Sequence, residues 1–271
     1  MGGWVMNARM YAVTPAVEAL WRALLGHVTR DAGVPLEYVS YPAPQPLEAL
    51  WSRRDLGAAF MCGFPIALGL APVQVIAAPV PRAPWAAGRP LFRTDLIVRA
   101  DAPYQRLEDT FGARSGWTVA HSHSGFNAWR HHLLGYRQAQ RPRLYGQMRR
   151  ELITARAVLD AVREGAIDVG PLDAYWHLLI ARHAPELTAG IRVLGATATA
   201  PIPPLVAAAG APASMVQALR GAFLAAAGRP WFAPFGEELL LERFSEANGE
   251  RYAPLLEWDR QARAAGYPEP A

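Results

Sequence analysis

Lysine is absent from this chain of 271 residues, so all 27 of its basic residues are arginines. The absence excludes enzymes that form a Schiff base through a lysine, such as those that use pyridoxal phosphate. The single cysteine, Cys62, excludes an internal disulfide and a cysteine-rich metal site. Charged residues make up only 18% of the chain and hydrophobic residues 52%. This composition predicts a globular protein. A chain of this length is long enough to form two domains.

A strong positive charge is also missing, because the formal net charge is only +4. The densest group of arginines lies at 137–150, and aromatic residues do not alternate with them as single-strand binding would favour. A solvated loop and helix face explains this group equally well. We therefore expect no nucleic-acid partner.

The stretch Leu56–Pro81 contains no charged residue and is long enough to suggest a membrane span. Glycines and prolines interrupt it repeatedly, however, which favours a buried strand, turn, helix and strand instead. We therefore expect a chain that does not span the membrane. Residues 1–9 lack the basic start and apolar run of a secretory signal, so a cytoplasmic location stays open.

Predicted strands and helices alternate along the chain, which is typical of a parallel sheet covered by helices. The first helix is the clearest, with Thr14 as its cap, Pro15 at its first position and Gly33 at its end. Strands are expected at 9–13, 36–41, 56–61, 73–78, 94–98, 117–120, 167–170, 191–195 and 205–209. Further helices are expected at 46–53, 127–134, 151–164, 172–181, 212–227, 236–247 and 252–265.

One segment of polar residues follows the expected strand Trp117–Ala120 and precedes the helix expected from Asn127. It contains two hydroxyls, two imidazoles and a glycine: His121, Ser122, His123, Ser124 and Gly125. The start of a helix has unpaired backbone N–H groups and a partial positive charge. Small hydroxyl residues there would let an anion approach closely. The alternative is that Ser124 simply caps the helix.

Several short motifs along the chain resemble one known family. They are Ala161–Asp168, Asp168–His177, Pro185–Leu187, Ile191–Thr197, Pro201–Pro204, Tyr252–Leu256, Ala265–Pro268 and the run His-Ser-His-Ser-Gly-Phe at 121–126. Together they are similar to the phosphate, phosphite and phosphonate substrate-binding proteins of ABC transporters. The resemblance covers nearly the whole chain.

The resemblance implies an α/β, two-lobed, type 2 periplasmic-binding-protein (flytrap) architecture with two crossing hinge strands. Lobe 1 would be residues 1–98 plus 200–271, and lobe 2 would be residues 99–199. A protein of this family captures a small anion between its lobes by hinge closure, and an ABC transporter permease would be its partner. The family is periplasmic, so the resemblance and the N-terminal sequence point to different compartments.

The resemblance also implies which residues contact the ligand. Ser122, Ser124, Gly125 and Phe126 match the anion-binding turn of the family, and we place His121 and His123 beside them in the candidate site. Tyr41 and Phe64 match aromatic or hydroxyl positions of lobe 1, although both could be core aromatics. Asp173 matches an acidic position that can meet a cationic group, or it could cap the following helix.

One departure from the family concerns the ligand. Family members commonly carry a histidine where this chain has Ala155, after Thr154. An anionic ligand, a phosphonate-like or phosphate-like oxyanion or a small organic acid, is still the prediction.

Two other classes of function remain as alternatives. His121 and His123 could bind a metal together with His131 or His132, but the helix would place those imidazoles about 10 Å further along, so no metal is predicted. The chain could also be a cytoplasmic enzyme or a ligand sensor on the same fold that acts on a small metabolite. No catalytic residue and no cofactor are predicted.

Overall fold

The computed structural model describes residues 3–271 and divides the chain into two compact units. Unit 1 comprises the chain up to Phe92 together with Pro201–Ala253, and unit 2 comprises Arg93–Ala200 together with Pro254–Ala271. The α/β class with two lobes is confirmed. The chain passes between the units after Phe92, after Ala200 and after Ala253. The lobe boundaries given by the resemblance, 1–98 plus 200–271 and 99–199, stay a prediction. Residues 254–271 belong to unit 2 because they pack on its helices.

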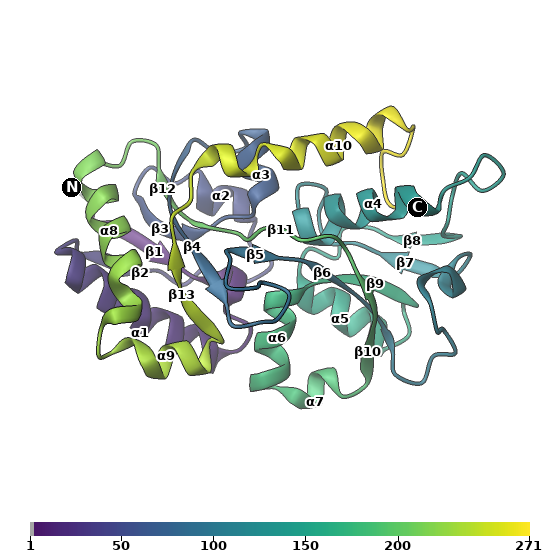
Figure 1. Cartoon of the computed structure of the whole chain (residues 1–271), viewed down its shortest axis with the longest axis horizontal. Coiled ribbons are helices and arrows are strands. Elements are labelled where there is room, and N and C mark those ends of the chain that lie inside the picture. Colours follow the sequence, from purple (N-terminus) through teal and green to yellow (C-terminus); the bar gives the residue numbers. More distant parts are fainter. Residues whose placement is uncertain (1–2) are drawn as a thin grey trace. The chain divides into compact units, whose positions relative to one another are not determined.

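Unit 1 is built on a six-stranded sheet with the order β13-β4-β12-β3-β1-β2 (Figure 1). The strands are β1 Trp4–Asn7, β2 Leu36–Tyr38, β3 Leu56–Phe60, β4 Val73–Pro81, β12 Leu205–Ala208 and β13 Leu241–Ser245. β1 is parallel to β2 and β3, whereas β12 and β13 run antiparallel to their neighbours. The sheet is therefore mixed, and the wholly parallel sheet expected from the alternation is wrong.

The helices of unit 1 follow the sequence signals at most positions. They are α1 Pro15–Ala32, α2 Leu47–Trp51, α3 Gly63–Leu68, α8 Ala213–Ala225 and α9 Phe232–Glu238, with short 3-10 turns at Arg9–Tyr11, Ala226–Gly228 and Gly249–Tyr252. Thr14 Oγ1 accepts from the amide of Val17 at 3.2 Å, and Gly33 ends α1 with φ of 65°. The cap and the terminating glycine of α1 are therefore confirmed.

Two predicted elements of unit 1 are wrong. The strand expected at 9–13 is the 3-10 turn Arg9–Tyr11, and the strand itself is β1, which precedes it. The helix expected at 236–247 contains the strand β13, which pairs with the end of β4. Its apolar residues suit a helix or a strand equally, so the free edge of the unusually long β4 decides the conformation.

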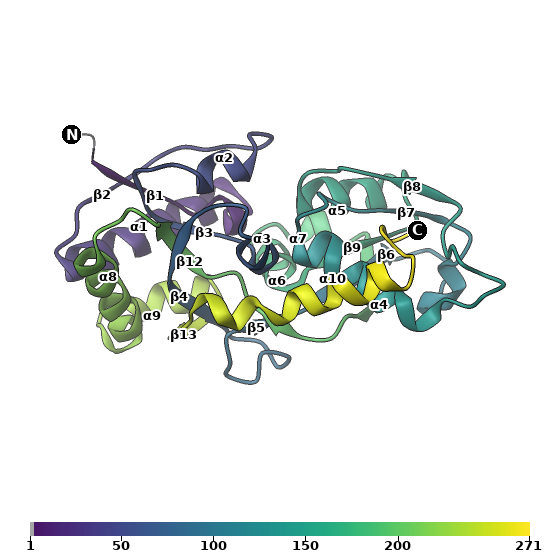
Figure 2. The ribbon, with the colours of Figure 1, turned by 90° about the horizontal axis from the view of Figure 1, so that it is seen from above.

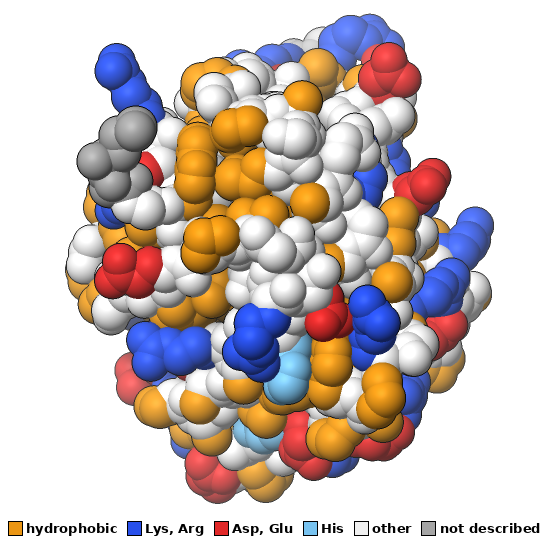
Figure 3. All heavy atoms as spheres, turned by 90° about the vertical axis from the view of Figure 1, so that its left-hand side faces the viewer, with side chains coloured by type: hydrophobic (Ala, Val, Ile, Leu, Met, Phe, Trp, Pro, Cys, Tyr) orange, Lys and Arg blue, Asp and Glu red, His pale blue; other side chains and the backbone are white. Residues whose placement is uncertain are grey.

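The uncharged stretch 56–81 forms β3, α3 and β4, as predicted. Within residues 3–271, no helix combines the length and the apolar character that a membrane crossing requires. On the face of the molecule in Figure 3, arginine and acidic side chains are interspersed, so that face carries no continuous basic surface.

Unit 2 is built on a five-stranded sheet with the order β10-β6-β9-β7-β8. The strands are β6 Thr94–Arg99, β7 Arg114–Gly116, β8 Gln147–Arg149, β9 Val169–Asp173 and β10 Ile191–Ala196. A two-stranded pairing joins β5 Leu91–Phe92 and β11 Ala200–Pro201, where the chain passes between the units. In the five-stranded sheet β6 is antiparallel to β9 and β10, and β7 is parallel to β8 and β9.

Helices cover both faces of this sheet. Figures 1 and 2 show α5 on one face and α4 with α10 on the other. The helices are α4 Ala128–Leu133, α5 Ala155–Arg163, α6 Ala174–His183, α7 Pro185–Thr188 and α10 Pro254–Ala264, with a π-turn η3 at His123–Asn127 and 3-10 turns at Leu107–Thr110 and Leu134–Tyr136. Trp129 and Leu133 of α4 pack on Leu96 and Val98 of β6, which fixes α4 on the sheet.

Candidate functional site

The polar segment 121–125 lies in unit 2, at the start of a continuous helical run. The expected strand 117–120 is wrong, because the ladder of β7 ends at Gly116. Beyond it, the carbonyls of Trp117 and Thr118 accept from the amides of Leu152 and Ile153, in the loop after β8. The helical run begins at His123, four residues earlier than predicted, and its first turn is the π-turn η3. The segment is therefore mostly helix instead of loop.

Ser122, and not Ser124, caps this run. Ser122 Oγ accepts from the amide of Gly125 at 3.0 Å, and the Ser122 carbonyl accepts from the amide of Asn127 at 3.0 Å. The hydroxyl of Ser124 forms no hydrogen bond within residues 3–271. The Ser124 side chain is thus not explained by capping.

The backbone of Ser124 is held by a threonine of the neighbouring strand. Thr94, the first residue of β6, donates from Oγ1 to the Ser124 carbonyl at 3.1 Å. The Thr94 amide donates to Thr197 Oγ1 at 3.1 Å, and Thr94 lies opposite Asp173 in the β6–β9 ladder. Thr94 is therefore bonded to Ser124 and Thr197 and lies opposite Asp173. These three residues are at least nine-tenths buried.

Thr94 and Thr197 were not predicted as site residues. A buried threonine at the end of an apolar strand is common, and nothing in the local sequence shows which loop it will reach. The only available signal was that each hydroxyl lies next to a predicted strand end, as the polar segment itself does.

Gly125 lies against the side chain of Thr118, which belongs to the turn before the helix. Thr118 Oγ1 is buried and has no hydrogen-bond partner within the described chain. The Thr118 amide donates to the Gly125 carbonyl at 3.3 Å. The glycine is thus required by close packing, whatever else the turn does.

Asp173 caps helix α6. Its Oδ1 accepts from the amides of Tyr175 and Trp176 at 2.9 and 3.0 Å. Of the two roles considered for this residue, capping is the one that these bonds show. The carboxylate nevertheless lies in the same group as Thr94 and Ser124, so a ligand contact stays a prediction.

The imidazole of His123 is buried inside unit 2, where its ring lies 5.1 Å from that of Trp258 in α10. Burial, with a smaller contribution from the charge of His131, lowers the pKa of His123 from 6.5 to about 3. His123 is therefore neutral at physiological pH and gives no positive charge to an anion. His121 precedes the cap and is half-buried.

Phe126 is also a packing residue. Its ring meets that of Trp117 edge-on at 4.9 Å, and the guanidinium of Arg130 lies 4.9 Å above it. The structure thus brings together all six predicted residues of the 121–126 segment, but their side chains divide. The Ser122 hydroxyl caps the run and the Ser124 backbone is bonded to Thr94, whereas Phe126 and His123 pack against aromatic rings inside unit 2.

Tyr41 and Phe64 belong to unit 1. The Tyr41 hydroxyl donates to the Pro46 carbonyl at 2.7 Å, and the guanidinium of Arg9 lies 5.5 Å above its ring. Phe64 is buried in α3, directly after the helix begins. Both surroundings are compatible with the core role considered from the sequence, and ligand contact stays a prediction for each.

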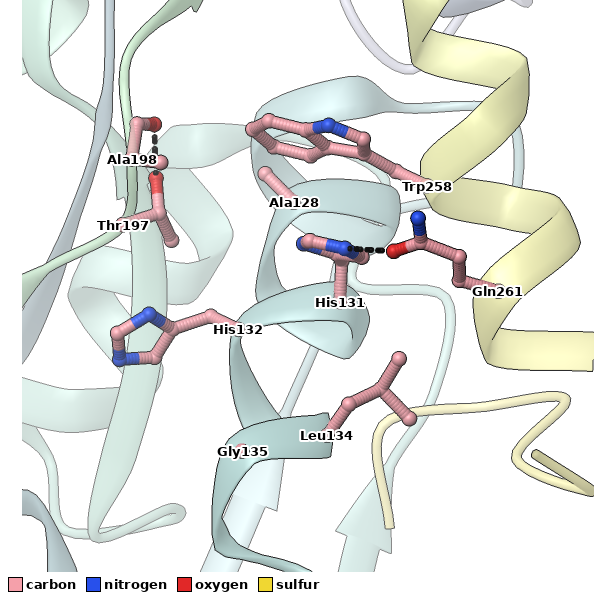
Figure 4. A pocket seen from close by; sticks show the side chains of 9 residues that line it. All are labelled: Ala128, His131, His132, Leu134, Gly135, Thr197, Ala198, Trp258 and Gln261. Atoms are coloured by element: carbon pink, nitrogen blue, oxygen red, sulfur yellow. Dashed lines mark hydrogen bonds between the residues drawn. The ribbon is translucent and has the colours of Figure 1, made fainter.

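A pocket of about 370 Å³ lies beside α4 in unit 2 (Figure 4). Its lining residues are Ala128, His131, His132, Leu134, Gly135, Thr197, Ala198, Trp258 and Gln261. His131 stacks on Trp258 at 4.6 Å between ring centroids and is hydrogen-bonded to Gln261 at 2.7 Å. In Figure 4 the ring of His132 points away from His131. Within residues 3–271, no three His, Cys, Asp or Glu side chains are placed to share a metal ion.

Comparison with known proteins identifies one matching family. The sequence model of the periplasmic substrate-binding proteins of phosphonate ABC transporters matches residues 12–252. No curated protein sequence matches the chain.

Solved structures share the fold at low sequence identity. A binding-protein component of a phosphonate ABC transporter from Pseudomonas aeruginosa is 15% identical, with a TM-score of 0.80 over 98% of this chain and 88% of that one. PhnD1 from Prochlorococcus marinus, in complex with methylphosphonate, is 15% identical, with a TM-score of 0.77 over 96% and 98%. A protein from Xanthomonas citri bound to ATP is 18% identical, with a TM-score of 0.66 over 98% of both chains.

Proposed function

This chain belongs to the family of periplasmic substrate-binding proteins of phosphonate ABC transporters, and we propose that it binds a small oxyanion at the Ser122–Asn127 turn of unit 2. The family works by delivering a solute to a membrane permease, so an ABC transporter permease is the proposed partner. A periplasmic location is proposed on the same basis. Capture of the ligand between the two units, which the resemblance implies, stays a prediction.

The observation that carries the proposal is the uncommitted hydroxyl of Ser124 at the start of a helical run. Ser122 already provides the cap, so a second hydroxyl is not needed for the helix itself. Early helix amides lack intrahelical acceptors and favour a negative charge near them. The amide and the hydroxyl of Ser124 together would give an oxyanion two donors from one residue.

The chemistry of the turn favours a tetrahedral oxyanion held by neutral donors. Neither His123, whose pKa is lowered to about 3, nor any arginine of the segment 121–127 supplies a positive charge there. Hydrogen bonds from neutral donors to a charged acceptor are strong when water is excluded. A phosphonate or phosphate offers three or more acceptor oxygens to such donors, and a carboxylate offers two.

A departure from the family pattern bears on which oxyanion is bound. Where relatives commonly carry a histidine, this chain has Thr154 and Ala155, and Thr154 caps α5 by accepting from the amide of Ala157 at 3.0 Å. The missing imidazole removes a hydrogen-bonding group from that place. We therefore expect the order of affinity among phosphonates, phosphate and phosphite to differ from that of PhnD1, which binds methylphosphonate.

Isothermal titration calorimetry with methylphosphonate, phosphate, phosphite and succinate tests the proposal. At least one phosphorus oxyanion should bind and raise the melting temperature by mass action. Ser124→Val should abolish binding, whereas Ser214→Val, on the exposed first turn of α8, should leave it unchanged. If only succinate bound, the ligand would be an organic acid and not a phosphorus oxyanion. If Ser124→Val bound the ligand as tightly as Ser214→Val does, the turn would not be part of the site.

The alternative of an enzyme on the same fold has its own test. A catalyst would convert the bound compound, and phosphorus NMR of a mixture of protein and methylphosphonate would show a new resonance. A binding protein returns the compound unchanged.

A further inference from the structure

The C-terminal segment, residues 254–271, packs against the turn that we propose as the ligand site. It contains α10, which lies along α4 in Figures 1 and 2. Trp258 of α10 contacts both His123 and His131, at 5.1 and 4.6 Å between ring centroids. In Figure 4, Trp258 and Gln261 reach α4 from the facing helix.

A buried arginine joins this segment to the turn. Arg130 of α4 is completely buried and forms an ion pair with Asp259 of α10. It also donates to the Pro268 carbonyl and to Asn127 Oδ1, each at 2.9 Å. One guanidinium thus contacts the helix α10, the residues after it and the turn.

Asn127, the last residue of the turn, forms hydrogen bonds through both the nitrogen and the oxygen of its side-chain amide. Asn127 Nδ2 donates to the Leu255 carbonyl at 3.0 Å, and its Oδ1 accepts from Arg130. The ring of Phe126, its neighbour, lies beneath the same guanidinium. The side chains of Phe126 and Asn127 are therefore held by Arg130 and by residues 254–271.

The turn needs such support because it is a π-turn. The amides of Asn127 and Ala128 donate to carbonyls five residues earlier, at Ser122 and His123. Such π-turns are rare, occur mostly as single turns inside α-helices and are frequent at functional sites. Relaxation to the α pattern would rotate Ser124 and Gly125 relative to Thr94.

We propose that residues 254–271 hold the turn in its ligand-binding conformation, with Arg130 as the positioning residue and Asp259 as its counter-ion. The ligand part of this proposal rests on the proposed function, whereas the conformational part does not. Removal of the Asp259 charge would leave a buried guanidinium without compensation. Arg130 would then leave its position between Asn127 and Phe126, and the π-turn would lose its anchor.

Asp259→Asn and Glu269→Gln form a matched pair for the test. Both replace a carboxylate of the C-terminal segment by its amide. Asp259 pairs with Arg130 and with the exposed Arg263, and Glu269 pairs with Arg150. The Glu269 partner, Arg150, donates two hydrogen bonds to Glu269, and within residues 3–271 its side chain donates none to the turn. Only D259N should therefore affect residues 122–128.

Hydrogen–deuterium exchange of the ligand-free protein is the first measurement. D259N should accelerate exchange of the amides of residues 122–128 by tenfold or more, and E269Q should not. Equal exchange of these amides in D259N and in the original protein would overturn the proposal, even if no ligand is found. If D259N does not fold, Trp258→Phe, which keeps an aromatic ring against His123, replaces it. This variant should accelerate exchange of the same amides by less than tenfold, and unchanged exchange would overturn the proposal.

Titration with methylphosphonate and phosphate well below the melting temperature is the second measurement. D259N should weaken binding by at least tenfold while the protein remains fully folded, and Asp259→Glu should restore part of the affinity. A lower melting temperature with unchanged affinity would show a purely structural role and would overturn the proposal. Absence of binding by the original protein would contradict the proposed function only, because the exchange result would still decide this one.

Discussion

A β-carbon placed on Gly125 would lie 2.0 Å from Thr118 Oγ1. Real β-carbons do not approach another heavy atom so closely, so the turn can form only with glycine at this position. The contact links the helix start to the preceding turn within one segment of eight residues. It explains the glycine by packing, independently of any ligand.

Gly125→Ala should displace the turn and weaken oxyanion binding by at least tenfold, because Thr118 or the helix start must move. We expect a loss of stability of about 1–3 kcal/mol, as for other overpacked buried positions. Denaturant unfolding and titration calorimetry would measure both effects. Gly135→Ala is the control, because a β-carbon there meets no atom within 4 Å. Equal behaviour of the two variants would contradict the packing argument.

Thr94→Val should lower stability by about 1 kcal/mol through loss of the hydrogen bond to the Ser124 carbonyl. Ligand affinity should fall as well, since that bond positions Ser124. Thr188→Val is a matched control, because Thr188 Oγ1 donates to a carbonyl at the same distance, 3.1 Å, on exposed α7. If T94V and T188V changed affinity equally, Thr94 would have no special place in the site.

Asp173→Ala should destabilise the protein by about 1 kcal/mol, because α6 loses its cap. Asp173→Asn keeps an oxygen for the two amides and should retain most of the stability. Comparing the affinity of D173N with that of the original protein separates capping from ligand contact. A change in affinity without a change in melting temperature would show that the carboxylate meets the ligand.

The burial of His123 predicts a loss of stability in acid. Its pKa is about 3 in the folded protein and 6.5 when exposed, so the unfolded chain binds the additional proton between these values. Stability from this group is complete above pH 6.5 and is lost as the pH falls toward 3, by up to about 1.4 kcal/mol per pH unit.

Unfolding free energies of His123→Gln between pH 7 and 4 would measure that loss. The variant should show a flatter dependence on pH than the original protein. His27→Gln, which removes a half-buried imidazole stacked on Trp231, serves as the control for the loss of a histidine elsewhere in the chain. An unchanged slope in H123Q would contradict a neutral, buried imidazole in the folded state.

Local signals were sufficient where the local sequence decides the structure. Thr14, Pro15 and Gly33 bound the first helix correctly, because capping and termination depend on residues within one turn. The uncharged stretch 56–81 was correctly assigned to β3, α3 and β4 for a similar reason, since glycines and prolines interrupt it. Motifs along the whole chain were sufficient for the family and its two-lobed fold.

Other features depend on contacts between distant segments and could not be predicted. The conformation of β13 is decided by the edge of β4, which lies about 160 residues earlier in the chain. The bond from Thr94 to the Ser124 carbonyl joins two segments that lie 30 residues apart in the chain. The packing of α10 on α4 depends on a buried Arg130, and an arginine in a helix is usually expected to face solvent.

The three passages of the chain between the units also constrain the order in which the protein can fold during synthesis. Unit 1 is interrupted by 108 residues of unit 2, from Arg93 to Ala200, and waits for β12 and β13 before its sheet is complete. Unit 2 is completed later still, because Arg130 can pair with its counter-ion only after Asp259 has been synthesised. A ribosome-bound chain that ends at Ala253 would therefore contain a complete unit 1 beside a unit 2 that still lacks Asp259 and the rest of residues 254–271.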